Sequence, residues 1–352
     1  MSANDSSAAG DGGGPGPAAL LRTLASLPGE RDELVAVVNG LFGDTLDARG
    51  SRFATPMTIR RDGAPLPLDR DGLRAALADH PNIDGRICVL VHGLMSTESI
   101  WRFPDGPAAG YGTLLGADHG LTTLTVRYNT GRHISTNGRE LAQLLNRLVA
   151  AWPVRVREIS LIGHSMGGLV ARSACHYARR VRSPGRRFPI GRPWTDRLRR
   201  LVLIGVPNTG AGLEALVNSA SAALWAVPLP PSRLVALGLD QRSAGIKDLR
   251  YGAIVDEDWL EQDPGARRRT HPHRPHRLRR TRHLVIAGSV TSDPEHPVAR
   301  MIGDALVTVP SAAGRSPDGE LLPGAVVQAF PGLTHNALAH HPEVYDAICV
   351  WW

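Results

Sequence analysis

The 352-residue sequence predicts an α/β protein with a mostly parallel central sheet and helices on both of its faces. Short apolar runs of strand length recur at 87–91, 121–128, 159–162, 201–205, 282–289 and 325–330. Helical patterns lie between them, the clearest around 141–148, where leucines recur at helical spacing. Glycine-rich or polar loops follow several of the strands, at the carboxyl ends where such sheets carry their chemistry.

The composition favours a globular protein without a membrane segment. An apolar content of 42% in a chain of this length suffices for one large α/β domain or two small ones. No run approaches the roughly 18 to 20 apolar residues needed to cross a bilayer. Residues 1–17 are small and polar, unlike a signal peptide, and are expected to be a disordered tail.

The cysteines indicate a reducing compartment. Cys88, Cys175 and Cys349 all lie in apolar stretches, and an odd number at wide spacing argues against a disulfide framework. Together with the absence of a signal-peptide pattern, this predicts a cytoplasmic location.

The net charge of +7 is carried by arginine, since Lys247 is the only lysine. Two arginine-rich runs, 178–200 and 267–283, contain proline and glycine and lack the aromatic spacing of a base-stacking platform. We interpret them as solvated loops, so no nucleic-acid partner is expected and only transient contact with a membrane surface stays open. The intervening arginines would repel a divalent cation from the local histidines, and no metal site is expected there. Those histidines are His271, His273, His276 and His283.

The stretch EISLIGHSMGGLVARS, residues 158–173, carries the strongest chemical signal. A strand-like run leads into Gly163, Ser165 and Gly167, and a helix-like run follows. A sharp strand-to-helix turn strains the serine and requires small neighbours, and it lifts the hydroxyl above the sheet edge. Ser165 is therefore the candidate nucleophile. A glycine-rich turn with a capping serine is the plainer alternative.

An oxyanion hole is predicted after the strand at 87–91. The sequence continues with His92 and Gly93, and a glycine here allows the chain to turn and present a backbone N–H beside the nucleophile. The N–H of Met166, directly after Ser165, would be the second donor. An ordinary turn at the strand end is the alternative.

A serine hydroxyl needs a base, and the base needs an orienting acid. His335 lies five residues after the last predicted strand, in a loop opened by proline and glycine, and is the preferred base. His340 and His341, next to a proline at the expected start of the closing helix, are the alternatives.

The acid is expected between the strand at 282–289 and His335. Asp293, Glu295 and Asp304 are candidates. Asp304 is favoured because Val307 and the apolar residues after it could bury and orient the carboxylate, whereas Asp293 lies in a polar, proline-rich loop.

With these residues in place, roughly residues 84 to 350 resemble the α/β-hydrolase superfamily, and more narrowly its lipase and esterase branch, which includes bacterial lipases and inositol deacylases. The motifs that carry the resemblance are VLVHGL, GHSMGG, LIGVPNTG, GDALVTVPSA and GLTHNALAHHPEVY. The resemblance implies a catalytic domain over 84–352, a triad of Ser165, Asp304 and His335, and backbone oxyanion donors at Leu94 and Met166. Residues 18–83 would be an extension packed on this core, either at the sheet edge or over the mouth of the site.

An apolar insertion at about 211–258 is predicted to be a helical lid. It contains Trp225 and a proline-rich break, and an apolar lining there would favour an acyl chain, with Trp225 contacting substrate. An ordinary pair of packing helices is the alternative.

The function predicted from the sequence is hydrolysis of a carboxylic ester through an acyl-enzyme, without a cofactor. The substrate would be a small-molecule ester or a lipid. An acyltransferase or thioesterase using the same triad, or a non-catalytic binding protein that keeps the pocket, are the alternatives, and the oligomeric state stays open.

Overall fold

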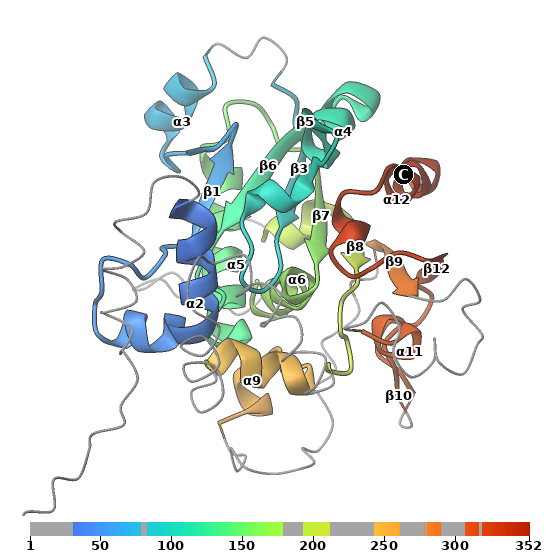
Figure 1. Ribbon diagram of the computed structural model, residues 1–352. Coiled ribbons are helices and arrows are strands. Elements are labelled where there is room, and N and C mark those ends of the chain that lie inside the picture. Colours follow the sequence, from blue (N-terminus) through green and yellow to red (C-terminus); the bar gives the residue numbers. More distant parts are fainter. Residues whose placement is uncertain are drawn as a thin grey trace, which may run out of the picture.

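The structure is a computed structural model of the 352-residue chain. It describes residues 31–78, 83–178, 193–211, 243–260, 278, 280–289, 307–316 and 319–352. Figure 1 shows these residues arranged around one central sheet.

The sheet has eight strands in the described part of the chain, in the order β12-β9-β8-β7-β3-β6-β1-β2. The six strands from β12 to β6 run parallel, which confirms the predicted fold class. Their carboxyl ends therefore meet at one edge of the sheet. The bounds are β3 (Arg86–Val91), β6 (Thr122–Arg127), β7 (Glu158–His164), β8 (Leu198–Ile204), β9 (Arg282–Ser289) and β12 (Val326–Pro331).

Helices cover both faces because the central strands are apolar on both sides. In β3, Ile87, Val89 and Val91 belong to one apolar cluster and Cys88 and Leu90 to another, as the two-residue period of a strand requires. The first cluster is completed by α3 (Arg70–Ala76), α5 (Ile134–Ala151) and α6 (Met166–Tyr177), and the second by α4 (Tyr111–His119) and α12 (Pro342–Trp351). The predicted helix around 141–148 is the middle of α5.

The described part of the N-terminal extension, from residue 31, contributes a hairpin and a helix. The hairpin of β1 (Thr58–Arg61) and β2 (Ala64–Pro65) extends the sheet edge antiparallel to β6. The helix α2 (Arg31–Ala48) packs instead on the loop after β3: a Cβ at Gly40 would lie 2.2 Å from Cγ of Met95. This helix therefore forms part of the wall beside the carboxyl edge.

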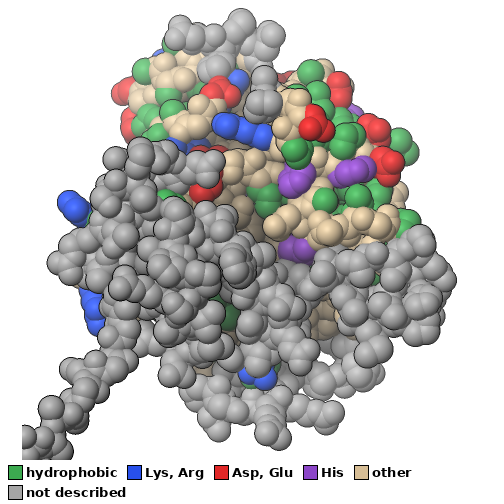
Figure 2. Space-filling view, in the orientation of Figure 1, with side chains coloured by type: hydrophobic (Ala, Val, Ile, Leu, Met, Phe, Trp, Pro, Cys, Tyr) green, Lys and Arg blue, Asp and Glu red, His purple; other side chains and the backbone are tan. Residues whose placement is uncertain are grey.

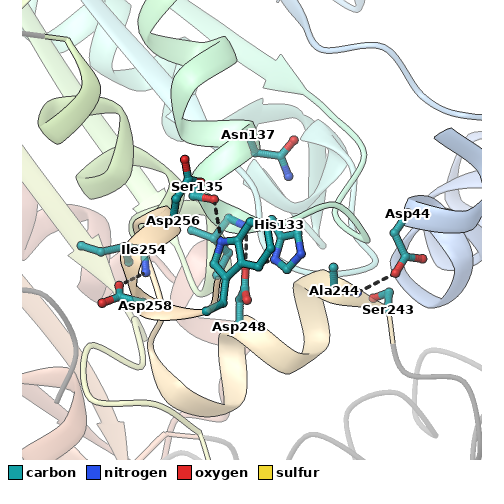
Figure 3. A network of polar contacts seen from close by, with 12 residues as sticks. Asp44, His133, Ser135, Asn137, Ser243, Ala244, Asp248, Ile254, Asp256 and Asp258 are labelled. Atoms are coloured by element: carbon teal, nitrogen blue, oxygen red, sulfur yellow. Dashed lines mark hydrogen bonds and ion pairs between the residues drawn. The ribbon is translucent and has the colours of Figure 1, made fainter. Parts of the chain in front are cut away.

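Most of the expected lid, 212–242, and Trp225 within it lie outside the described residues. The end of that range packs onto the body of the domain as α9 (Ala244–Tyr251) and η3 (Asp256–Asp258). Figure 3 shows its polar attachments: Asp44 of α2 accepts from the N–H of Ala244 at 2.9 Å, and Asp248 of α9 lies 3.0 Å from Nδ1 of His133. Residues 243–258 are thus a fixed part of the helical layer.

The remaining elements are short. They are η1 (Glu98–Trp101), β4 (Arg102–Phe103), β5 (Gly106–Gly110), η2 (Trp194–Arg197), α11 (Val309–Ala312), β10 (Arg315–Ser316), β11 (Gly319–Glu320) and η4 (Ala337–Ala339). Among the described helices, none has the length and apolar character required to span a bilayer.

Candidate active site

The candidate residues that the structure describes gather at the carboxyl edge of the parallel sheet. Gly93 follows β3, Ser165 follows β7, and His335 follows β12. In Figure 2, purple histidine side chains are grouped on the side of the molecule where α12 lies in Figure 1.

Ser165 occupies a strained turn between β7 and α6, as the sequence predicts. Its φ of 52° and ψ of −126° are unusual for a residue with a side chain and cost about 1–3 kcal/mol. The turn is held from the neighbouring strand, because the Ser165 N–H donates to the carbonyl of Ile204 at 2.8 Å. The helix α6 begins at the next residue, Met166, so its N-terminus starts beside the serine.

The glycines around Ser165 are required by close contacts. A Cβ at Gly167 would lie 2.2 Å from the carbonyl oxygen of Val91, and one at Gly163 would lie 2.5 Å from Cα of Gly168. Real Cβ atoms do not approach backbone this closely, so any larger residue would push β3, β7 and α6 apart. The pattern of small residues thus has the steric origin expected from the sequence.

The loop after β3, residues 92–97, passes directly against Ser165. A Cβ at Gly93 would lie 3.0 Å from Cβ of Ser165. The preceding carbonyl, that of His92, accepts from the hydroxyl of Tyr128 at 2.8 Å, and the two rings stack with centroids 4.6 Å apart. The loop therefore lies beside Ser165 at Gly93.

The backbone of His335 contacts the residue that precedes Ser165. Nε2 of His164, the residue before Ser165, lies 3.0 Å from the carbonyl oxygen of His335, and the two rings are 4.8 Å apart. Because a carbonyl only accepts, Nε2 of His164 carries the proton. The other end of the loop is held by the Gly332 N–H, which donates to the carbonyl of Ser289 at 2.6 Å. The His335 side chain itself is buried.

The two alternative histidines serve other contacts. Nδ1 of His340 lies 3.2 Å from the carbonyl oxygen of Ile100. His341 is the N-cap residue of α12, in an extended backbone conformation and without a side-chain capping hydrogen bond. The backbone carbonyl of His335 is the one that accepts from His164, next to Ser165.

Burial keeps His164 and His92 neutral. Removal from water lowers the pKa of His164 well below its ordinary value, and the nearby His335 lowers it further. Burial likewise lowers the pKa of His92 to about 4. At neutral pH these rings thus act as uncharged hydrogen-bonding and packing groups.

Acidification is expected to destabilise the protein through His92. The unfolded chain protonates this ring near pH 6.5, whereas the folded protein does so only near 4, so the unfolded state binds more protons between these values. The free energy of unfolding should fall by about 2 kcal/mol from pH 6.5 to 4.5 through this group, and comparison with a variant that lacks the ring separates this fall from the contribution of carboxylates, which begin to titrate at the lower pH. Urea denaturation of the wild type and His92→Gln at both pH values measures this, and an equally steep loss in the variant would contradict the assignment.

The candidate acids Asp293, Glu295 and Asp304 lie outside the described residues. The chain that follows Asp304 is well anchored: Val307 is buried in the main apolar cluster. The carbonyl of Ala312 in α11 accepts from Nδ2 of Asn208, in the loop after β8, at 2.6 Å. Oδ1 of Asn208 accepts in turn from the buried Arg172 of α6 at 2.7 Å.

Three residues at this edge had no role in the sequence interpretation. His164 tethers the loop of His335, Tyr128 holds the carbonyl of His92, and Oγ1 of Thr130 accepts from the Met95 N–H at 3.2 Å. The sequence offered one signal for Tyr128 and Thr130. Both residues follow within three positions of the end of β6, the strand that pairs with β3.

In the described ranges, no three histidine, cysteine or acidic side chains come together as metal ligands. Three of the four histidines in the arginine-rich run, at 271, 273 and 276, lie outside those ranges. All three cysteines are free thiols.

This chain was compared with known sequences and structures. No curated protein matches the sequence. The mature lipase BlEst2 of Bacillus licheniformis is similar in structure, with 17% identity over 84% of this chain and 98% of that chain, at a TM-score of 0.48. Carboxylesterase CesB of Bacillus subtilis has 12% identity over 76% and 83%, with a TM-score of 0.41. Residues 88–348 match the alpha/beta hydrolase family, and the chain therefore belongs to that family.

Proposed function

We propose that this protein is a serine hydrolase that cleaves carboxylic esters. One observation carries the proposal: Ser165 sits in a strained turn, and the loop of His335 is hydrogen bonded to the residue directly before it. Backbone strain at a polar residue persists where the surrounding structure enforces it, and it clusters at functional sites. Membership of the alpha/beta hydrolase family supports the same reading.

The proposed reaction begins with attack of Oγ of Ser165 on the ester carbonyl while His335 removes the hydroxyl proton. Asp304 would orient His335 and stabilise the imidazolium. The N–H groups of Leu94 and Met166 would hold the oxyanion, and His335 would pass its proton to the departing alcohol. Water, deprotonated by His335, then attacks the acyl-enzyme and releases the acid. The reaction needs no cofactor.

Two other functions are compatible with the same residues. An acyltransferase or thioesterase would form the same acyl-enzyme and differ in the acceptor or the leaving group. A non-catalytic binding protein would bind a ligand in the same pocket and would not form an acyl-enzyme. The strain at Ser165 and the tethered His335 loop favour catalysis, because neither is needed to bind a ligand.

The test combines a fluorophosphonate probe with nitrophenyl esters of increasing chain length. We expect labelling of Ser165 and turnover of the esters in water. Faster product formation in excess alcohol, with transfer of the acyl group, would assign the protein as a transferase. If the probe did not label the protein and no ester were turned over, the protein would be assigned as a binding protein without catalytic activity.

The ester series also tests the substrate class. An apolar lid that includes Trp225 should make longer acyl chains better substrates, since each buried methylene contributes roughly 0.8 kcal/mol. We expect kcat/KM to rise from acetate toward medium-chain esters, and Trp225→Gln to flatten this rise while acetate turnover is kept. An acetate preference in the wild type, or an unchanged profile in the variant, would remove Trp225 from the acyl pocket.

A further inference from the structure

We propose that Thr130 is a positioning residue that sets the backbone of the 92–97 loop so that the Leu94 N–H faces the oxyanion. This inference rests on the proposed function. Thr130 lies in the loop between β6 and α5, is almost fully buried, and has no direct role in the reaction.

The starting point is the backbone of Met95. Its φ of 55° lies in the left-handed region, which costs about 1–2 kcal/mol for a residue with a Cβ. The Met95 N–H donates to Oγ1 of Thr130 at 3.2 Å, and the Met95 side chain is packed under α2 at Gly40. The strained conformation is thus held from two sides by parts of the chain far away in sequence.

The hydrogen bond also engages one of the two amides that follow Gly93 in this turn. Gly93 lies against Ser165, and two backbone N–H groups follow it, those of Leu94 and Met95. The second is directed to Thr130, which orients the peptide between Leu94 and Met95. Leu94 is therefore held between a glycine fixed at the nucleophile and an amide fixed at Thr130.

Thr130 is itself well placed to act as an anchor. Its carbonyl oxygen lies against α9, where a Cβ at Gly245 would come within 2.1 Å of it. Two residues earlier in the same loop, the Tyr128 hydroxyl fixes the carbonyl of His92. One short segment after β6 thus fixes both ends of the turn that carries Leu94, through His92 and Met95.

The test compares Thr130→Val, which keeps the shape and removes the acceptor, with Thr130→Ser, which restores it. Thr123→Val is the control, because the Thr123 hydroxyl also bonds to the backbone, donating to the carbonyl of Gly112, and lies in β6, the strand that precedes the loop of Thr130, away from the site. Steady-state kinetics on a nitrophenyl ester, thermal midpoints and amide exchange of Met95 are measured for all three.

We expect Thr130→Val to lower kcat about tenfold with KM changed less than about twofold, because the oxyanion forms only in the transition state. Direct loss of an oxyanion donor costs more, about 10²- to 10³-fold. The Met95 amide should exchange faster in this variant alone. Thr130→Ser should restore kcat, and Thr123→Val should lose similar thermal stability with kcat unchanged.

Two failures can be told apart. If the wild type turns over ester and Thr130→Val matches Thr123→Val in kcat, the positioning role is wrong while the proposed function stands. If the wild type is neither labelled at Ser165 nor active, the proposed function is wrong, and the oxyanion role of Leu94 and Thr130 is overturned with it.

Discussion

Ser165→Ala is expected to reduce ester hydrolysis by about 10⁴-fold or more and to abolish labelling by a fluorophosphonate. The loss follows from removing the atom that would form the acyl-enzyme, which no neighbouring group can replace. The fold should be unchanged, because the side chain is small and the local hydrogen bond to Ile204 comes from the Ser165 backbone. Activity, labelling and the thermal midpoint together measure this.

The matched control is Ser173→Ala. Ser173 lies further along the same helix α6 and is fully buried, and its hydroxyl donates to the carbonyl of Ile254 at 2.5 Å. We expect this variant to lose stability but to keep labelling and turnover per folded molecule. If the Ser165 variant were still labelled, another serine would be the nucleophile.

Asp304→Asn is expected to lower kcat by about 10³- to 10⁴-fold. An asparagine amide can donate where the carboxylate only accepts, so the imidazole of His335 would lose the orientation and charge stabilisation that a base needs. Folding should be retained, since Asn is nearly isosteric with Asp. The variant should therefore stay folded in circular dichroism while turnover is lost.

Asp293→Asn is the control for the position of the acid. It carries the same chemical change 11 residues earlier on the same connection between β9 and α11, and we expect nearly wild-type turnover. Asp304 is the preferred acid because the apolar residues after it could bury and orient its carboxylate, and one of them, Val307, is buried. If Asp293→Asn lost turnover and Asp304→Asn kept it, the acid would lie in the first part of this connection, at Asp293.

The parallel sheet and the turn at Ser165 could be predicted from the sequence because both depend on local patterns. Strands buried on both faces read as continuous apolar runs, as in β3 and β7. The turn requires glycines at fixed offsets from the serine, and the contacts of Gly163 and Gly167 explain why.

The residues that hold the loops of the candidate site in place could not be predicted in the same way. Tyr128, Thr130 and His164 act through hydrogen bonds to backbone atoms that are remote in sequence, and a backbone carbonyl or amide has no sequence signature. The position of α2 against Met95 was likewise hidden, because a glycine that permits close packing looks like any other glycine within a helix. Such contacts depend on the tertiary arrangement of segments.

The tether between His164 and His335 has a consequence for the order of folding. The two residues are 171 positions apart in the chain, and β12, which leads to His335, comes last in chain order among the described strands. At about 5–20 residues per second, that segment emerges roughly ten to thirty seconds after the nucleophile. During this interval β3, β7 and β8 can already pair and strain Ser165, since the bond to Ile204 needs only β8. With the roles proposed above, the serine would be set in its geometry before its base is synthesised, and the nascent protein would be inert until β12 joins the edge of the sheet beside β9.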